Sequence, residues 1–227
     1  MNLSDAQIAV LAENQYQELE LWYPVLRLRE AGANVVVVAP SADQVYASKL
    51  GYPVAADLGA EEVDPATLDG IVIPGGFAPE GMRRHKPMVD LVRAVHDQGS
   101  MVAAICHAGW MLASAGIAKD RNVTCVSIIK DDVINAGGRY SDVPVVRDGN
   151  IITSRLPSDL PDFCREIVRY LEAAPTRRND LTKLRSRNAS SANYTQRANL
   201  VMGPRGRRQL HNGRFCRRTD GLARRDR

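Results

Sequence analysis

The pair Cys106-His107 follows a short apolar run and precedes the small residues Ala108-Gly109. The run over residues 101–105 is short enough for a buried strand, and residues 108–115 are typical of a closely packed helix. A cysteine at such a strand-to-helix turn faces the N-terminus of the helix, where free N–H groups and the helix dipole favour the thiolate. The pattern therefore predicts a nucleophile elbow in which Cys106 has a lowered thiol pKa, with a buried structural cysteine as the alternative.

Two other segments carry groups that such a nucleophile could use. Residues 13–20 are rich in carboxyl and amide side chains and end at Glu20, and residues 74–80 begin Pro-Gly-Gly and end at Glu80. The glycine pair lets the backbone turn tightly and expose its N–H groups. A thiolate, an imidazole, a carboxylate and backbone donors are the components of a site for acyl transfer or for addition to a carbonyl group.

Alternating strand and helix patterns position these segments. Apolar runs predict strands over residues 7–12, 34–39, 70–73, 101–105 and 123–129, and a hairpin over residues 144–153. Helices are predicted between them, and the first presents Leu19, Trp22, Tyr23 and Leu26 at helical spacing as one core-facing side. This order favours an α/β fold with a mainly parallel sheet and helices on both faces, in which ligands bind at the carboxyl ends of the strands. The three chemical segments converge at that edge.

Composition limits the class of protein. The chain of 227 residues has 44% hydrophobic residues, enough for one large core. No apolar run reaches the roughly 18 residues of a membrane span, and the N-terminus lacks the pattern of a secretory signal. The four cysteines form no C-x-x-C pair. Neither a disulfide framework nor a metal site is expected, Cys125 and Cys164 are expected in the core, and a cytoplasmic location is predicted.

The charge is distributed unevenly along the chain. Residues 1–175 contain 15 Lys/Arg and 23 Asp/Glu, whereas residues 176–227 contain 15 Lys/Arg and only 3 Asp. Hydrophobic periodicity also stops near residue 174. We therefore expect a domain over residues 1–174 and a basic, disordered tail over residues 175–227. Non-specific binding of nucleic acid is conceivable for such a tail, but a solvated extension is the preferred interpretation.

The motifs resemble those of the ThiJ/PfpI superfamily, and within it the PfpI-type (intracellular protease I) branch. The resemblance covers residues 6–172 and is carried by matching segments in the same order: residues 20–24, 74–80, 104–107, 129–137, 148–150 and 154–160. It implies a flavodoxin-like three-layer sandwich that assembles into dimers or hexamers. It also implies cofactor-independent chemistry, although members of this superfamily act as peptidases, glyoxalases, deglycases, chaperones and isonitrile hydratases.

The resemblance also implies roles for individual residues. Cys106 is the expected nucleophile, Glu20 the acid that hydrogen-bonds its sulfur, and His107 the base. Glu80 of a neighbouring subunit is expected to orient His107. The backbone N–H groups of Gly76 and His107 are the expected oxyanion hole, with Gly75 and Arg155 in supporting roles.

Three departures from the family pattern affect the expected substrate. Gln17 stands where a glutamate is usual, Ala108-Gly109-Trp110 replaces the usual Gly-Pro after the Cys-His pair, and Val126 replaces a pocket tyrosine.

Two functions remain open. One is a cysteine enzyme acting on small carbonyl compounds, their adducts or peptide amides. The other is a stress protein in which Cys106 serves as an oxidation sensor, or whose surface holds unfolded chains.

Overall fold

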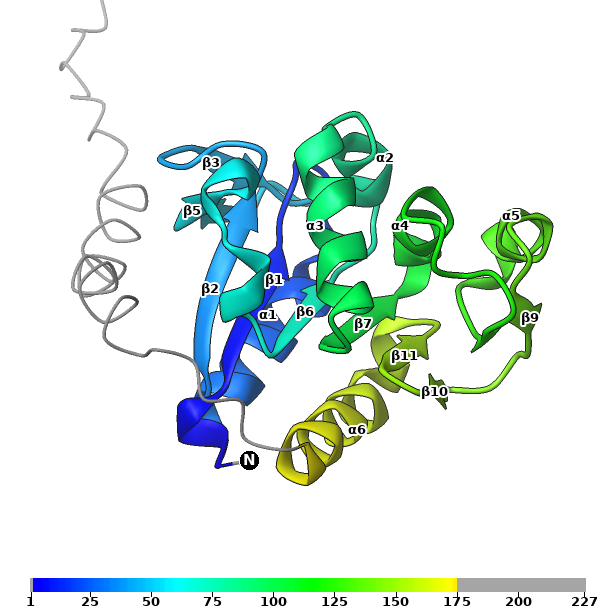
Figure 1. Ribbon diagram of the computed structural model, residues 1–227. Helices are drawn as coiled ribbons and strands as arrows, with labels where there is room; N and C mark the ends of the chain where they lie inside the picture. The colour runs from blue at the N-terminus through cyan, green and yellow to red at the C-terminus, as the bar shows by residue number, and fades with distance from the viewer. Residues whose placement is uncertain (1, 175–227) are drawn as a thin grey trace, which may run out of the picture.

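The computed structural model describes residues 2–174, which form an α/β sandwich around a seven-stranded sheet (Figure 1). The predicted basic tail over residues 175–227 lies outside the described residues. The strand order is β10-β11-β7-β6-β1-β2-β5. All neighbouring strands run parallel except β10, which is antiparallel to β11. Within this order, β2, β1, β6, β7 and β11 give the 2-1-3-4-5 arrangement of the flavodoxin-like fold, so the predicted fold class is confirmed.

Apolar sequence explains the central strands, which are buried on both faces as parallel sheets require. The strands of the main sheet are β1 (Gln7–Leu11), β2 (Asn34–Ala39), β5 (Leu58–Gly59), β6 (Gly70–Ile73), β7 (Met101–Ile105), β10 (Val145–Asp148) and β11 (Ile151–Ser154). Two small sheets lie beside it: β3 (Val45–Ala47) with β4 (Pro53–Ala55), and β8 (Asn122–Val123) with β9 (Arg139–Tyr140).

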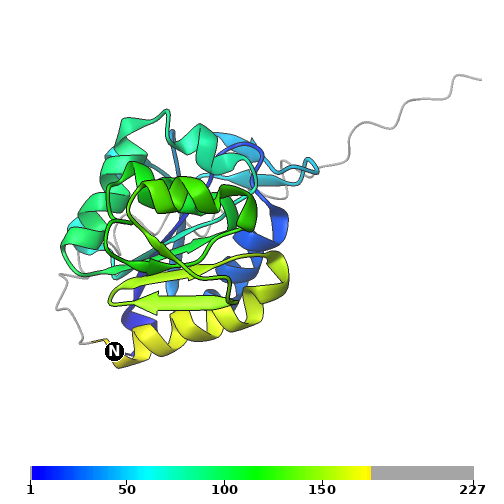
Figure 2. The same cartoon turned by 90° about the vertical axis from the view of Figure 1, so that its right-hand side faces the viewer.

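Helices cover both faces of the sheet (Figure 2). On one face α1 (Glu18–Glu30) packs against α6 (Leu160–Ala173). On the other, α3 (Lys86–Asp97) packs on β6 and β7 and contacts α4 (Gly109–Ser114), and the short α2 (Ala78–Met82) also contacts α4. The short helix α5 (Lys130–Asn135) packs on α4 and β9. None of the helices within residues 2–174 has the length and apolar character needed to cross a membrane.

Two sequence expectations are wrong in detail. The strand predicted over residues 123–129 is limited to β8, because the following backbone donors bond elsewhere: Thr124 N–H donates to the Thr153 hydroxyl and Val126 N–H to the Cys106 carbonyl. Cys125 and Cys164 are in the core as predicted, with 1% exposure each.

The other error concerns the first helix. Of the predicted stripe, Leu19, Tyr23 and Leu26 are 55%, 38% and 60% exposed, and only Trp22 packs against the core. The buried side of α1 instead consists of Glu20, Leu21, Pro24, Val25 and Leu28. Helix α1 is therefore apolar on two sides, and only one of them meets the core.

Candidate active site

The carboxyl ends of three neighbouring strands bring the candidate residues together. In the order β7-β6-β1, these strands are followed by Cys106, by Gly75-Gly76 and by helix α1 with Glu20. The order of the chain reverses between β1 and β6, and such a switch point is where ligands bind in open α/β sheets. The sequence prediction that the three segments converge is confirmed by this arrangement.

Cys106 occupies a sharp turn between β7 and α4 (Figure 1). Its φ angle is +61°, in the left-handed region that a non-glycine residue adopts only at a cost of order 1–3 kcal/mol. A short 3₁₀ turn over Cys106–Ala108 then leads into α4. The backbone N–H groups of Gly76 and His107 donate hydrogen bonds to the Cys106 sulfur. The turn therefore directs the sulfur toward the donors that were expected to form an oxyanion hole.

Glu20 lies beside this sulfur in a fully buried position. Its Oε2 accepts the N–H of Gly75 at 2.8 Å, and its carboxyl group forms a hydrogen bond with the Cys106 thiol. Oε1 has no nitrogen or oxygen partner among residues 2–174. Burial raises the pKa of Glu20 to about 7, against the lowering effect of these hydrogen bonds and of the Lys49 charge. A carboxyl group with such a pKa can exchange a proton near neutral pH.

The Cys106 thiol does not have the lowered pKa that the elbow pattern predicts. Burial is the main reason that its pKa rises to about 12, and the neighbouring Glu20 carboxylate raises it further. The N–H donors of His107 and Gly76 act in the opposite direction without reversing this result. The expectation from sequence was wrong because it left out the burial of Cys106, which is 8% exposed, and took Glu20 as a hydrogen-bond donor to the sulfur rather than as a carboxylate that repels the thiolate.

Glycine is required at both positions after β6, because neighbouring atoms come too close to leave room for a side chain. A Cβ atom on Gly75 would lie 2.6 Å from Glu20 Oε2 and 2.7 Å from Cys106 Cβ. Gly76 has a φ of +72°, and a Cβ there would lie 2.4 Å from the carbonyl oxygen of Gln15. Any side chain at either position would separate the carboxyl, the thiol and the backbone donors.

Gln17 holds the helix that carries Glu20. It is the N-cap of α1, and its side-chain oxygen accepts the backbone N–H of Glu20 at 2.9 Å. In the sequence, Gln17 stands out only as a departure from the family pattern. A residue that caps a helix commonly accepts the backbone N–H three residues later. The spacing of Gln17 and Glu20 could therefore have identified Gln17 as the cap.

His107 is half-buried next to the sulfur, with Nδ1 3.3 Å from Cys106 Sγ. Burial lowers its pKa, and so does the positive charge of Lys49. The imidazole is therefore neutral near pH 7 and can accept a proton. Its ring also contacts two aromatic side chains, Phe77 and Trp110, with centroids 6.0 and 5.2 Å away.

Two predicted site residues lie away from this centre. Glu80 on α2 has a 58% exposed side chain and an ion pair with Arg84 at 3.4 Å, and within residues 2–174 it is not a partner of His107. Arg155 bridges Asp142 and Asp159 at 2.7 and 2.9 Å at the end of β11. It joins the loops around that strand end and touches none of the reactive groups. No group of three or more His, Cys, Asp or Glu within the described part of the chain could hold a metal ion.

Comparisons with known proteins identify the family of the chain. The sequence matches the DJ-1/PfpI family over residues 6–170. The deglycase PfpI of Pyrococcus furiosus is 42% identical over 166 residues, which cover 73% of this chain and 99% of that protein. The deglycase TK1284 of Thermococcus kodakarensis is 40% identical over 165 residues, with the same coverage.

A solved structure gives the same result for the fold. The crystal structure of Drosophila melanogaster DJ-1beta superposes with a TM-score of 0.70 at 26% identity, covering 83% of this chain and 98% of that one. A match over nearly the whole described domain, together with relatives at 40% and 42% identity, establishes the relationship. The chain belongs to the DJ-1/PfpI family.

Proposed function

We propose that the protein is a cofactor-independent cysteine enzyme that removes dicarbonyl adducts, such as those of methylglyoxal, from amines and thiols. The observation that carries this proposal is the Cys106 sulfur, which sits at an elbow between two backbone N–H donors and a buried carboxyl group of raised pKa. The thiol is only 8% exposed, which suits a small adduct better than a polypeptide. Relatives with about 40% identity are named deglycases.

The first step uses Glu20 as the base. Its carboxylate takes the Cys106 proton as the sulfur attacks the carbon that joins adduct and amine. A C–S bond forms, the C–N bond breaks, and the amine leaves with the proton that Glu20 returns. The N–H groups of Gly76 and His107 stabilise negative charge on the sulfur before it attacks.

The second step regenerates the thiol. The resulting hemithioacetal undergoes an internal hydrogen shift, in which the carbon that bears sulfur is oxidised and the neighbouring carbonyl is reduced. Neutral His107, 3.3 Å from the sulfur, is the base for this shift. Water then hydrolyses the thioester to a 2-hydroxy acid. The overall reaction of adduct and water to amine and hydroxy acid needs no external oxidant or reductant.

The active unit in this proposal is an oligomer. A carboxylate that orients His107 is absent from the described part of the same chain, so we assign that role to Glu80 of a second subunit. The exposed apolar stripe of Leu19, Tyr23 and Leu26 on α1 offers surface for contact between subunits.

The test is a direct comparison of wild type with Cys106→Ala on methylglyoxal adducts of N-acetylcysteine, on free methylglyoxal and on fluorogenic peptides. Release of the thiol and of lactate by the wild type alone supports the proposal. Turnover confined to peptides would replace it with a peptidase. No turnover at all, combined with reversible oxidation of Cys106, would favour the sensor function instead.

A further inference from the structure

A continuous row of rings and cations borders His107 beside the reactive sulfur. The Lys49 ammonium lies 5.4 Å from the centre of the Phe77 ring, and Phe77 is followed by His107 and then by Trp110. At the far end, the Arg83 guanidinium lies 5.9 Å from the Trp110 ring. The row thus presents three rings with a positive charge at each end.

The members of the row are held by their own hydrogen bonds. Phe77 N–H donates to the Gln15 carbonyl at 2.9 Å, and Lys49 N–H to the Tyr16 carbonyl at 3.0 Å. The indole N–H of Trp110 donates to Asp132 at 2.7 Å, and Arg83 donates to the Ser114 hydroxyl at 2.6 Å. Phe77 is nevertheless 52% exposed, which is unusual for a large aromatic side chain in a position fixed by the backbone.

The charge that reaches the site from this row is positive. Lys49 lowers the pKa of both Glu20 and His107, so its field extends to the two groups beside the sulfur. Two carboxylates lie close to the row: Glu18 accepts the Leu50 N–H at 2.7 Å and interacts with the Lys49 charge, and Asp132 accepts the Trp110 indole N–H. The Lys49 ammonium itself lies over the face of the Phe77 ring.

We propose that the row formed by Lys49, Phe77, His107, Trp110 and Arg83 is a subsite that selects carbonyl adducts bearing a carboxylate. The ring faces pack against the hydrocarbon part of the substrate, and the Lys49 ammonium pairs with its carboxylate. A longer adduct, on the side chain of a free amino acid, extends along the rings toward Arg83. This inference rests on the proposed function, since it names the substrate class of the same site.

A pair of alkylating reagents tests the charge preference without relying on turnover. Iodoacetate and iodoacetamide differ only in carboxylate against amide, and both react with the same thiolate, which displaces iodide. The rate with iodoacetate divided by the rate with iodoacetamide, both measured on the peptide that contains Cys106, is therefore independent of the thiol pKa. Relative to the ratio for free N-acetylcysteine, we expect the wild-type ratio to be higher by about threefold to sevenfold, the Coulomb factor of one cation some 7 Å away in a partly aqueous site.

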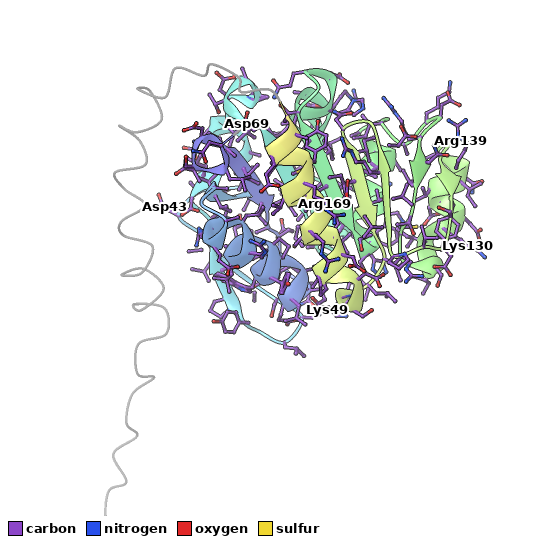
Figure 3. All side chains as sticks on the ribbon, turned by 90° about the horizontal axis from the view of Figure 1, so that it is seen from below. Asp43, Lys49, Asp69, Lys130, Arg139 and Arg169 are labelled. Atoms are coloured by element: carbon purple, nitrogen blue, oxygen red, sulfur yellow. The ribbon has the colours of Figure 1, made fainter. Side chains whose placement is uncertain are left out.

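The variants make the test specific. Lys49→Gln is expected to remove most of the preference, Lys49→Arg to retain it, and added salt to reduce it. Arg139→Gln is the matched control, because Arg139 is an exposed cation on β9 well apart from Lys49 (Figure 3). A wild-type ratio equal to that of the free thiol, or a ratio unchanged in Lys49→Gln, would overturn the proposal.

Turnover separates this inference from the proposed function. Methylglyoxal adducts of N-acetylcysteine and of its amide differ by one carboxylate, and Lys49→Gln should reduce kcat/KM for the acid by about threefold to sevenfold more than for the amide. Arg83→Gln should act in the same direction on the adduct of a free amino acid side chain. If neither adduct is processed while the alkylation ratio still depends on Lys49, the proposed function fails and the anion preference stands.

Discussion

The buried carboxyl group of Glu20 should make the stability of the protein fall as the pH rises, and Glu20→Gln should remove that dependence. Burial is the main reason that the pKa of Glu20 rises from 4.5 to about 7 in the folded protein. In the unfolded chain the carboxyl keeps its ordinary value. Between these two pKa values the unfolded chain has lost a proton that the folded protein retains, so unfolding becomes easier with each step in pH.

The magnitude follows from the two pKa values. One pKa unit corresponds to 1.36 kcal/mol, so a rise from 4.5 to about 7 costs about 3 kcal/mol of unfolding free energy above pH 7 and nothing well below pH 4.5. Glutamine has nearly the same shape and does not ionise. Its amide oxygen can accept the Gly75 N–H that Glu20 accepts at 2.8 Å, and its NH₂ group can donate to the sulfur.

The assay is urea unfolding of both proteins at about pH 4 and about pH 8. Other titrating groups are common to the two proteins, so the difference between their two pH dependences isolates Glu20. Between the two pH values, the wild type should lose about 3 kcal/mol relative to Glu20→Gln. The same comparison in a Cys106→Ala background should retain most of this loss, because burial is the main cause. Parallel pH dependences of wild type and variant would show that Glu20 is not held in a desolvated site.

Four further outcomes are expected. In Glu20→Gln, the pH profile of Cys106 alkylation by iodoacetamide should shift to lower pH by part of the rise from 9.0 to about 12, because the carboxylate no longer opposes the thiolate while burial, the larger cause, remains; an unchanged midpoint would contradict this. Gly75→Ala should slow alkylation at least tenfold and cost about 1–3 kcal/mol of stability, because its Cβ would overlap Glu20 and Cys106. Truncation after Ala174 should leave the melting temperature and turnover unchanged, since the expected tail lacks apolar periodicity; a large loss would assign it a structural role. Glu80→Gln should reduce turnover only in the oligomeric form, and a fully active monomer on size-exclusion chromatography would contradict its role.

The sheet and the elbow could be predicted because both are encoded locally. Uninterrupted apolar runs give buried parallel strands, and Cys106 between a strand and small residues gives the turn. The predicted strand over residues 123–129 failed for a reason that is not local. Its backbone donors find the Thr153 hydroxyl and the Cys106 carbonyl, which are distant in sequence.

Helix α1 shows a second limit of pattern reading. Leu19, Tyr23 and Leu26 have the spacing of a core stripe, but the buried stripe is the adjacent one with Leu21, Val25 and Leu28. Periodicity identifies a helix and its apolar sides, yet it does not say which side meets the sheet. In α1 that choice also decides that Glu20 points inward, so a surface-like carboxyl in the sequence becomes a buried one in the fold.

The row from Lys49 to Arg83 had no signal in the sequence at all. Its members come from a loop after β3, from the segments that follow β6 and β7, from α4 and from the end of α2. Only their contacts in space connect them. The sequence shows Ala108-Gly109-Trp110 in place of the usual Gly-Pro, but it does not show which side chains lie next to Trp110.

The raised pKa of Cys106 and its proposed role as a nucleophile are compatible because the proton need not leave the site. Loss of the proton to water would add a charge to a buried pair, and burial opposes this for both groups. Transfer from the sulfur to Glu20 keeps the total charge of the pair at −1, so most of the desolvation cost cancels. The N–H groups of Gly76 and His107 then stabilise the thiolate, while the protonated carboxyl can donate a hydrogen bond to it. The reactive form is thus reached by moving one proton along one hydrogen bond, which requires the carboxyl and the thiol to touch. The absence of a side chain at Gly75 preserves that contact.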